Sequence, residues 1–150
     1  EKAAKDERAA DAGERPEGLL EGVPRSLPAL MQAQKVSRKA AALGFEWEST
    51  AAVWEKVAEE RAEYEREEPG SAEREMEFGD LLFALVNVAR KDGIDAESAL
   101  RASTAKFRSR WEAMEAEAYE RGVALDGLST AELNDLWDRV KADEGMTAEG

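Results

Sequence analysis

Apolar residues recur at every third or fourth position along most of the chain, a spacing that places them on one face of an α-helix. No segment of the sequence alternates between apolar and polar residues over the length of a β-strand. Residues that start or stop helices divide the pattern into five segments. The predicted helices cover Pro28–Leu43, Ser49–Glu67, Ser71–Lys91, Ala96–Arg121, and Ser129 to about Ala142. We therefore predict an all-α fold, a bundle of about four main helices and a short C-terminal helix joined by short loops.

The helix boundaries rest on residues with known terminal preferences. Asp95 and Ser129 can cap the first turn of a helix, and Glu132 stands at the capping-box distance from Ser129. Gly44 and Gly122 stop helices because glycine adopts the left-handed backbone conformation that often follows the last turn. The remaining stop signals are the pairs Pro69-Gly70 and Asp92-Gly93.

The N-terminal segment differs in composition from the rest of the chain. Residues 1–18 are rich in alanine, glycine and charge and are predicted to be a frayed helix end followed by a linker, so that residues 1–26 precede the helical domain. The stretch "EGVPRSLP", residues 21–28, carries two prolines and is predicted to be an ordered connection to the first helix. The helical domain is predicted over residues 27–143, and residues 144–150 are predicted to be a tail.

The composition excludes several classes of protein. The formal net charge of −13 repels phosphate backbones and anionic lipids, so we expect neither nucleic acid nor a membrane as partner. The chain has no cysteine, which excludes disulfides and fits a reducing compartment, so we expect a cytoplasmic location. It has no histidine, the commonest general base and the usual zinc ligand. Any catalysis must therefore come from carboxylates, lysine, arginine, hydroxyl groups or a metal ion.

The predicted helix Ser49–Glu67 carries acids on its apolar face. At about 100° per residue, Glu60 lies in the middle of the face that the apolar residues share. Glu63 and Lys56 lie at the edge of this face, whereas Glu59 points well away. Glu60 and Glu63 are therefore the acids of this helix that are predicted to point inward.

The predicted helix Ser71–Lys91 is apolar around most of its circumference and is therefore expected to be buried nearly all round. One narrow stripe differs, and it consists of Glu73, Glu77, Asp80, Ala84 and Asn87. A stripe that faces solvent would explain these acids without any function. The alternative is that two apolar helices meet along their acids with a cation between them. Carboxylates without histidine or cysteine form an all-oxygen site, which favours Mg²⁺ or Mn²⁺ over zinc.

The predicted helix Ala96–Arg121 contributes a basic pair, Lys106 and Arg110, one turn apart beside aromatic residues. Such a pair can simply extend along a helix edge, or it can hold phosphates that metal ions bridge. Trp137 in the last helix fits core packing, with stacking on a nucleobase as the alternative.

The spacing of the acids resembles a known family motif. The stretch "EERAE", thirteen further residues and then "EFGD" are similar to the E-E-x-x-E…E-x-x-D motif of the MazG family of nucleoside triphosphate pyrophosphohydrolases. The resemblance covers about Leu27 to Lys141. Further blocks stand in the family order: "LPALMQAQKVSRKAAALGFEW", "EFGDLLFALVNVAR", "KFRSRWEAME" and "LNDLWDRVK".

The resemblance implies roles for particular residues. It implies metal ligands at Glu60, Glu63, Glu77 and Asp80, with Mg²⁺ as the cofactor and Mn²⁺ as a substitute. It leaves the role of Glu59 open, because Glu59 matches the motif but points outward. The family's basic motif corresponds to Lys106 and Arg110. A looser match adds substrate-binding roles for Lys56, Asn87, Trp137 and Lys141.

The resemblance also implies an activity and an assembly. MazG-like enzymes hydrolyse nucleoside triphosphates between the α- and β-phosphates, giving the monophosphate and pyrophosphate, and they dimerise through their helices. Many members carry two copies of the domain, so the opening "EKAAKDERAADAGERPEGLL" is interpreted as the linker before a second copy. Two alternatives stay open: an all-α pyrophosphatase narrow for dUTP, dCTP or phosphoribosyl-ATP, and a catalytically silent helical interaction module.

Overall fold

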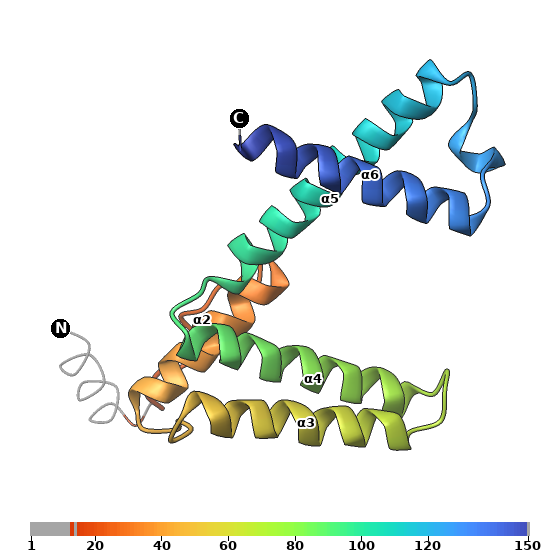
Figure 1. Ribbon diagram of the computed structural model, residues 1–150. Coiled ribbons are helices and arrows are strands. Elements are labelled where there is room, and N and C mark those ends of the chain that lie inside the picture. Colours follow the sequence, from red (N-terminus) through yellow and green to blue (C-terminus); the bar gives the residue numbers. More distant parts are fainter. Residues whose placement is uncertain (1–12, 14, 150) are drawn as a thin grey trace. The chain divides into compact units, whose positions relative to one another are not determined.

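The computed structural model describes residue 13 and residues 15–149, and these residues form helices and no strands. The helices are α2 (Ala29–Ala42), α3 (Thr50–Arg66), α4 (Ala72–Lys91), α5 (Ala96–Glu120) and α6 (Thr130–Glu149), with the 3₁₀ turn η1 (Leu125–Gly127) before α6 (Figure 1). The prediction of an all-α fold is confirmed. None of the described helices combines the length and the apolar character that a membrane-spanning helix needs.

Side-chain caps fix the starts of three helices. Ser49 Oγ accepts a hydrogen bond from the backbone N–H of Ala52 at 3.1 Å, and Ser71 Oγ accepts from that of Arg74 at 3.1 Å. Before α6, the hydroxyl of Ser129 accepts from the N–H of Glu132 while the Glu132 carboxylate accepts from the N–H of Ser129. These bonds satisfy amides that the first turn leaves without helical partners. The predicted capping box is confirmed.

The predicted end of the last helix is wrong. α6 continues to Glu149, past the expected end near Ala142, so it is a helix of 20 residues rather than a short one. The predicted tail, residues 144–150, is therefore helical as far as Glu149. Gly145 lies inside α6, where a glycine costs only about 1 kcal/mol relative to alanine.

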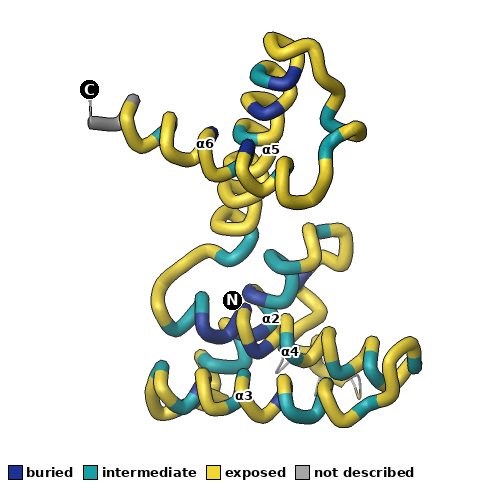
Figure 2. The backbone as a smooth tube through the Cα atoms, turned by 45° about the vertical axis from the view of Figure 1, so that its right-hand side comes forward, coloured by how far each residue is buried: buried dark blue, intermediate teal, exposed yellow. Residues whose placement is uncertain are grey.

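The chain divides into two compact units, Glu1–Glu97 and Ser98–Gly150. In the first unit, α3 and α4 run side by side as an antiparallel hairpin (Figure 1), and α2 packs against α4. The buried positions of this unit gather where the three helices meet (Figure 2). They include Val53, Ala84, Val86 and Val88. The hairpin therefore brings the acidic stripe of α4 against α3.

Polar contacts hold α2 in place. The buried side chain of Gln34 donates from Nε2 to the Ile94 carbonyl at 2.8 Å and accepts from the Ala96 N–H at 2.8 Å. On the other side of α2, Lys39 Nζ donates to the Leu19 carbonyl at 3.3 Å, and Val23 is buried. The predicted ordered connection before the first helix is confirmed. Residues 1–12 and 14 of the predicted linker lie outside the described residues.

In the second unit, α5 and α6 pack around a small apolar core. Its buried residues are Met114, Leu136 and Val140. Partly buried apolar side chains complete it, from the loop between the helices and from α6: Leu125, Leu128, Leu133 and Trp137.

Within the single chain, the expectation that α4 is buried nearly all round is wrong. Large apolar side chains of α4 stay exposed, among them Phe78 at 46%, Leu82 at 42% and Phe83 at 41%. Two helices, α2 and α3, make the main contacts with α4 in this chain. They cover the side that carries Ala84 and Asn87, which leaves an apolar face of α4 open.

Candidate metal and phosphate site

The acids of α3 and α4 converge on one point. Glu60 comes from α3, and Glu77 and Asp80 come from α4. One carboxylate oxygen of each lies within 4.8 Å of the others. We call these three residues the acidic cluster. The stripe of α4 therefore faces the neighbouring helix, although Asp80 and Glu73 at its surface keep contact with solvent.

The cluster could hold a cation, because one oxygen of each of two of its carboxylates is buried. Glu60 is only 6% exposed. Glu60 Oε2 and Glu77 Oε2 are buried and have no hydrogen-bond partner among the described residues. Buried polar atoms almost always have a partner, and a buried charge without one costs several kcal/mol. Oxygen ligands at this spacing suit a hard divalent ion such as Mg²⁺, so the residues present fit the implied metal.

Lys56, one turn before Glu60, supplies a positive charge beside the cluster. Its Nζ lies 2.8 Å from Glu60 Oε1 and 3.4 Å from Glu59 Oε1. The hydrogen bond to Glu60 is the main reason that the pKa of Lys56 is raised. Glu59 points outward, with a side chain that is 57% exposed, as the helical phase predicted.

Glu63 lies next to this cluster on α3 but is not one of its three members. Its side chain is half-buried, and desolvation raises the pKa of its carboxyl group. The hydrogen bond and the charge that Glu60 presents, and the charge of Glu77, raise the pKa further. A carboxyl group crowded by other carboxylates holds its proton more firmly, and a bound cation would reverse that effect.

A cavity of about 250 Å³ opens beside the acids. It brings together four of the predicted site residues, from both helices of the hairpin. It is lined by Trp47, Lys56, Glu60, Asp80, Phe83, Ala84 and Asn87. The cavity thus combines carboxylates that could bind a metal with an ammonium group, an amide and aromatic walls.

A network of hydrogen bonds fixes the orientation of the Asn87 amide. Asn87 is 1% exposed, and its Oδ1 accepts hydrogen bonds from the Ser37 hydroxyl of α2 and from Arg90 Nη2. Its Nδ2 donates to the Phe83 carbonyl at 3.2 Å. Arg90 Nε in turn donates to Ser37 Oγ at 2.8 Å. These bonds fix which end of the amide is oxygen and which is nitrogen.

Glu46, in the loop after α2, anchors this network. Its two carboxylate oxygens accept from Arg90 Nη1 at 2.5 Å and from Arg90 Nη2 at 2.8 Å. The hydrogen bond from Arg90 lowers the pKa of Glu46 to about 2. The sequence analysis missed Glu46, Ser37 and Arg90. Arg90 could have been found, because it lies one turn beyond Asn87 on the same helix.

The other predicted substrate-binding residues belong to the second unit. Arg110 lies with its guanidinium carbon 5.3 Å from the ring centre of Trp137 and pairs through Nε with Glu144 at 3.0 Å. Trp137 packs against the apolar core, as one of its two interpretations predicted. Lys106 and Lys141 are exposed on α5 and α6. The structure thus brings Arg110 and Trp137 together within their own unit.

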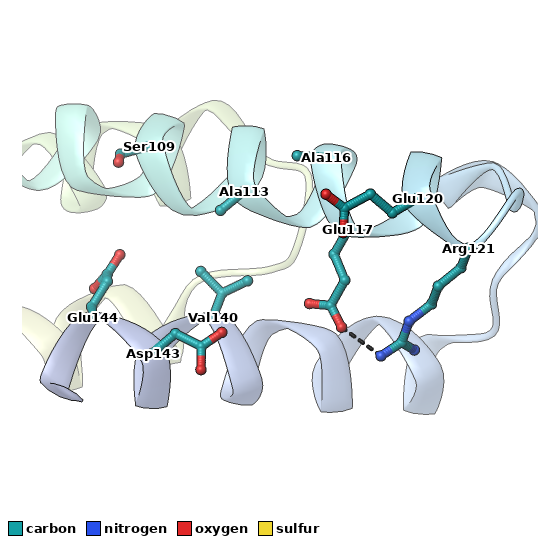
Figure 3. A pocket seen from close by; sticks show the side chains of 9 residues that line it. All are labelled: Ser109, Ala113, Ala116, Glu117, Glu120, Arg121, Val140, Asp143 and Glu144. Atoms are coloured by element: carbon teal, nitrogen blue, oxygen red, sulfur yellow. Dashed lines mark hydrogen bonds and ion pairs between the residues drawn. The ribbon is translucent and has the colours of Figure 1, made fainter. Parts of the chain in front are cut away.

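A larger cavity of about 790 Å³ lies between α5 and α6 (Figure 3). Its lining combines small side chains with four acidic ones. The lining residues are Ser109, Ala113, Ala116, Glu117, Glu120, Arg121, Val140, Asp143 and Glu144. Glu117 accepts from Arg121 and pairs with Arg139 at 3.2 Å, so its charge is compensated internally. An acidic groove of this kind does not attract a triphosphate.

Curated relatives match most of the chain. It is 41% identical over 129 residues to the nucleoside triphosphate pyrophosphohydrolase of Escherichia coli K12, a match that covers 83% of this chain and 49% of that protein. It is 35% identical over 136 residues to the nucleoside triphosphate pyrophosphohydrolase/pyrophosphatase MazG of Thermotoga maritima, covering 91% of this chain and 53% of that protein. These matches support the assignment of the chain to the MazG family. The resemblance drawn from the spaced acids is confirmed.

These matches cover only part of each relative. The chain spans about half the length of the two curated relatives. A shorter match, 44% identical over 78 residues, joins 52% of the chain to 16% of the uncharacterized protein YabN of Bacillus subtilis. No protein-family model matches the chain.

Proposed function

We propose that this chain is a Mg²⁺-dependent nucleoside triphosphate pyrophosphohydrolase that cleaves the α–β phosphoanhydride and releases the nucleoside monophosphate and pyrophosphate. We further propose that it accepts all common bases, works as a homodimer in the cytoplasm, and accepts Mn²⁺ in place of Mg²⁺. The named MazG-family relatives support the reaction class.

The observation that carries this proposal is the pair of buried carboxylate oxygens without partners, Glu60 Oε2 and Glu77 Oε2. A helical protein with no catalytic role has no reason to direct two such oxygens at one point between its helices. A catalytically silent module, the alternative from the sequence, would be more stable with apolar residues at these positions.

The acidic residues act on the metal and on the attacking water. Glu60, Glu63, Glu77 and Asp80 would hold the metal, which would screen the phosphates and lower the pKa of a water molecule. A carboxylate of this group takes the proton of the attacking water.

The basic residues act on the substrate. Lys106 and Arg110 stabilise the negative charge that develops on the phosphate oxygens in the transition state. Lys56, Asn87 and Lys141 bind the triphosphate, and Trp137 offers a ring for base stacking. Stacking accepts any base, which is why we propose broad specificity.

The exposed apolar face of α4 supports the dimer. Phe78, Leu82 and Leu85 lie on one side of the helix at spacings of four and three residues and are each about two-fifths exposed. Contiguous apolar surface of this kind is typical of an interface. A second copy of the chain would cover it with an identical face across a two-fold axis.

The test is a product assay with each common ribo- and deoxynucleoside triphosphate in the presence of Mg²⁺, resolving monophosphate from diphosphate. We expect monophosphate and pyrophosphate from the wild-type chain. Glu77→Gln and Asp80→Asn are each expected to lower kcat at least about a hundredfold, the usual scale for loss of an essential electrostatic group.

Glu75→Gln is the matched control, because it makes the same change of charge at an exposed position of α4. Its activity should equal that of the wild type, and circular dichroism should show all variants helical. Diphosphate as the product would refute the proposed cleavage site. Full activity of both cluster variants would refute the assignment of the acids.

A further inference from the structure

We propose that Lys56 is a movable counter-ion: it neutralises Glu60 while the acidic cluster holds no metal, and it passes to Glu59 when a divalent ion binds. This inference rests on the proposed function in that it takes the cluster as a metal site. It adds a role for Glu59, the motif acid that points away from the cluster.

The Lys56 ammonium group contacts one of the two oxygens of the Glu60 carboxylate. Nζ lies 2.8 Å from Glu60 Oε1, whereas Glu60 Oε2 is buried and without a partner among the described residues. Lysine therefore compensates only one of the two carboxylate oxygens. The free oxygen, together with Glu77 and Asp80, is left for a second cation.

A divalent ion bound to the cluster would repel the Lys56 ammonium group. A divalent ion held by Glu60 and its neighbours would lie within a few ångströms of the ammonium, in a site where two carboxylate oxygens are shielded from water. Like charges at that distance repel strongly in a medium of low effective dielectric constant. The Lys56–Glu60 pair and a bound ion therefore oppose each other, so that the lysine lowers the affinity of the site for metal.

A second carboxylate, that of Glu59, lies within reach of the Lys56 ammonium group. Glu59 Oε1 is already within 3.4 Å of Nζ, and the Glu59 side chain is 57% exposed. Lys56 itself is 35% exposed and lines the cavity. A change of side-chain rotamer is enough to exchange one carboxylate for the other, with no movement of the helix.

The exchange has a functional consequence. With metal bound, the ammonium group pairs with the exposed Glu59 instead of with the buried Glu60, beside the cavity that Lys56 lines. An exposed pair is weak, so the ammonium can then leave Glu59 for a phosphate of the triphosphate, which it cannot do while it neutralises Glu60 in the metal-free site. This favours binding in the order metal, then substrate.

The experiment is a titration of the metal-free chain with Mn²⁺, without substrate, following free Mn²⁺ by electron paramagnetic resonance. We expect Lys56→Met to lower Kd for the first ion about tenfold, which is about 1.4 kcal/mol. Its melting temperature without metal should be lower than that of the wild type, and Mn²⁺ should raise it by more. Lys56→Gln, which keeps a hydrogen-bond donor to Glu60, should also bind the ion more tightly.

Arg61→Met is the matched control, since Arg61 forms an i,i+4 ion pair with Glu65 on the same helix and is 72% exposed. Its Mn²⁺ affinity should stay within about twofold of the wild type, as expected for an exposed charge screened by salt. An equal gain in Arg61→Met would refute the proposal, because any nearby positive charge would then act as Lys56 does. Unchanged or weaker binding by both Lys56 variants would refute it directly.

The role of Glu59 is tested with a double-mutant cycle. Glu59→Gln should weaken Mn²⁺ binding about threefold, and in the Lys56→Met background this effect should fall to within experimental error, because the acceptor is needed only if the lysine moves. A loss that persists in that background would overturn the exchange.

The failure of this inference is distinguishable from the failure of the proposed function. A wild-type chain that binds Mn²⁺ and releases pyrophosphate, with Lys56 variants that bind no more tightly, refutes the counter-ion alone. A wild-type chain that binds no divalent ion refutes both.

Discussion

Replacing Glu46 by glutamine tests the network that positions the Asn87 amide. The substitution keeps the shape of the side chain but removes the negative charge that accepts two hydrogen bonds from Arg90. Glu46 has a folded-state pKa of about 2 against an ordinary value of 4.5. By linkage, a carboxyl group with a lowered pKa stabilises the folded state above its unfolded pKa and loses that contribution as the pH falls through its folded pKa.

The size of the effect follows from the same shift. At 1.36 kcal/mol per pH unit, the full shift would correspond to roughly 3 kcal/mol. Because the Glu46 side chain is 29% exposed, solvent screens the pair, and we expect a loss of about 1–2 kcal/mol in the free energy of unfolding at pH 7. The difference between wild type and Glu46→Gln should stay constant above pH 4.5 and narrow steadily toward pH 2.

The assay is urea denaturation of both proteins at a fixed protein concentration, at pH 7 and in steps from pH 5 downward. Glu65→Gln is the control: its partner Arg61 is also exposed, and we expect a loss below about 0.5 kcal/mol. Equal unfolding midpoints for wild type and Glu46→Gln at pH 7 would refute the reasoning. So would a difference that does not depend on pH between 4.5 and 2.5.

Further predictions concern the cavity, the second unit and the proposed assembly. Asn87→Leu removes the acceptor of the Ser37 hydroxyl and the weaker of the two acceptors of Arg90 Nη2, so urea denaturation should show a loss of about 1–3 kcal/mol, and a variant as stable as the wild type would contradict the network. Arg110→Met should raise KM for ATP at least several-fold, and an unchanged kcat/KM would remove this residue from the site. Sedimentation should show a dimer at micromolar concentration that Leu82→Glu shifts to monomer, whereas a monomeric wild type would contradict the interface. The values of kcat/KM for the four bases should lie within about a thousandfold of one another, roughly 4 kcal/mol of discrimination.

The acids of the site could be predicted because they lie on helices. Side chains on a helix repeat every 3.6 residues, so their directions follow from sequence position alone. That regularity selected Glu60, Glu77 and Asp80, which meet in the structure, and set Glu59 apart from them. The same reasoning placed Asn87 on the stripe that faces α3.

The parts that sequence could not reveal depend on loops and on partners. Glu46 lies in the connection between α2 and α3, where no periodicity relates it to Arg90, 44 residues further along. The apolar face of α4 was expected to be buried, but it is exposed in this chain. An apolar pattern predicts that a helix face packs against something, and it does not tell whether the same chain or a second one supplies the contact. The end of α6 was misjudged because a single glycine does not stop a helix that packs on a neighbour.

The hydrogen bonds that dock α2 have a consequence for the order in which the molecule folds. The hairpin of α3 and α4 joins residues close in sequence, so its formation closes a short loop and is fast. The bonds that dock α2 span 50 residues from Ser37 to Asn87 and 60 from Gln34 to Ile94, and they form only after a longer loop closes. All three acids of the cluster lie on the hairpin, whereas the Asn87 amide acquires its orientation when α2 arrives. A chain with α2 transiently detached therefore keeps its carboxylates together, and amide hydrogen exchange should find α2 opening at lower free energy than α3 and α4.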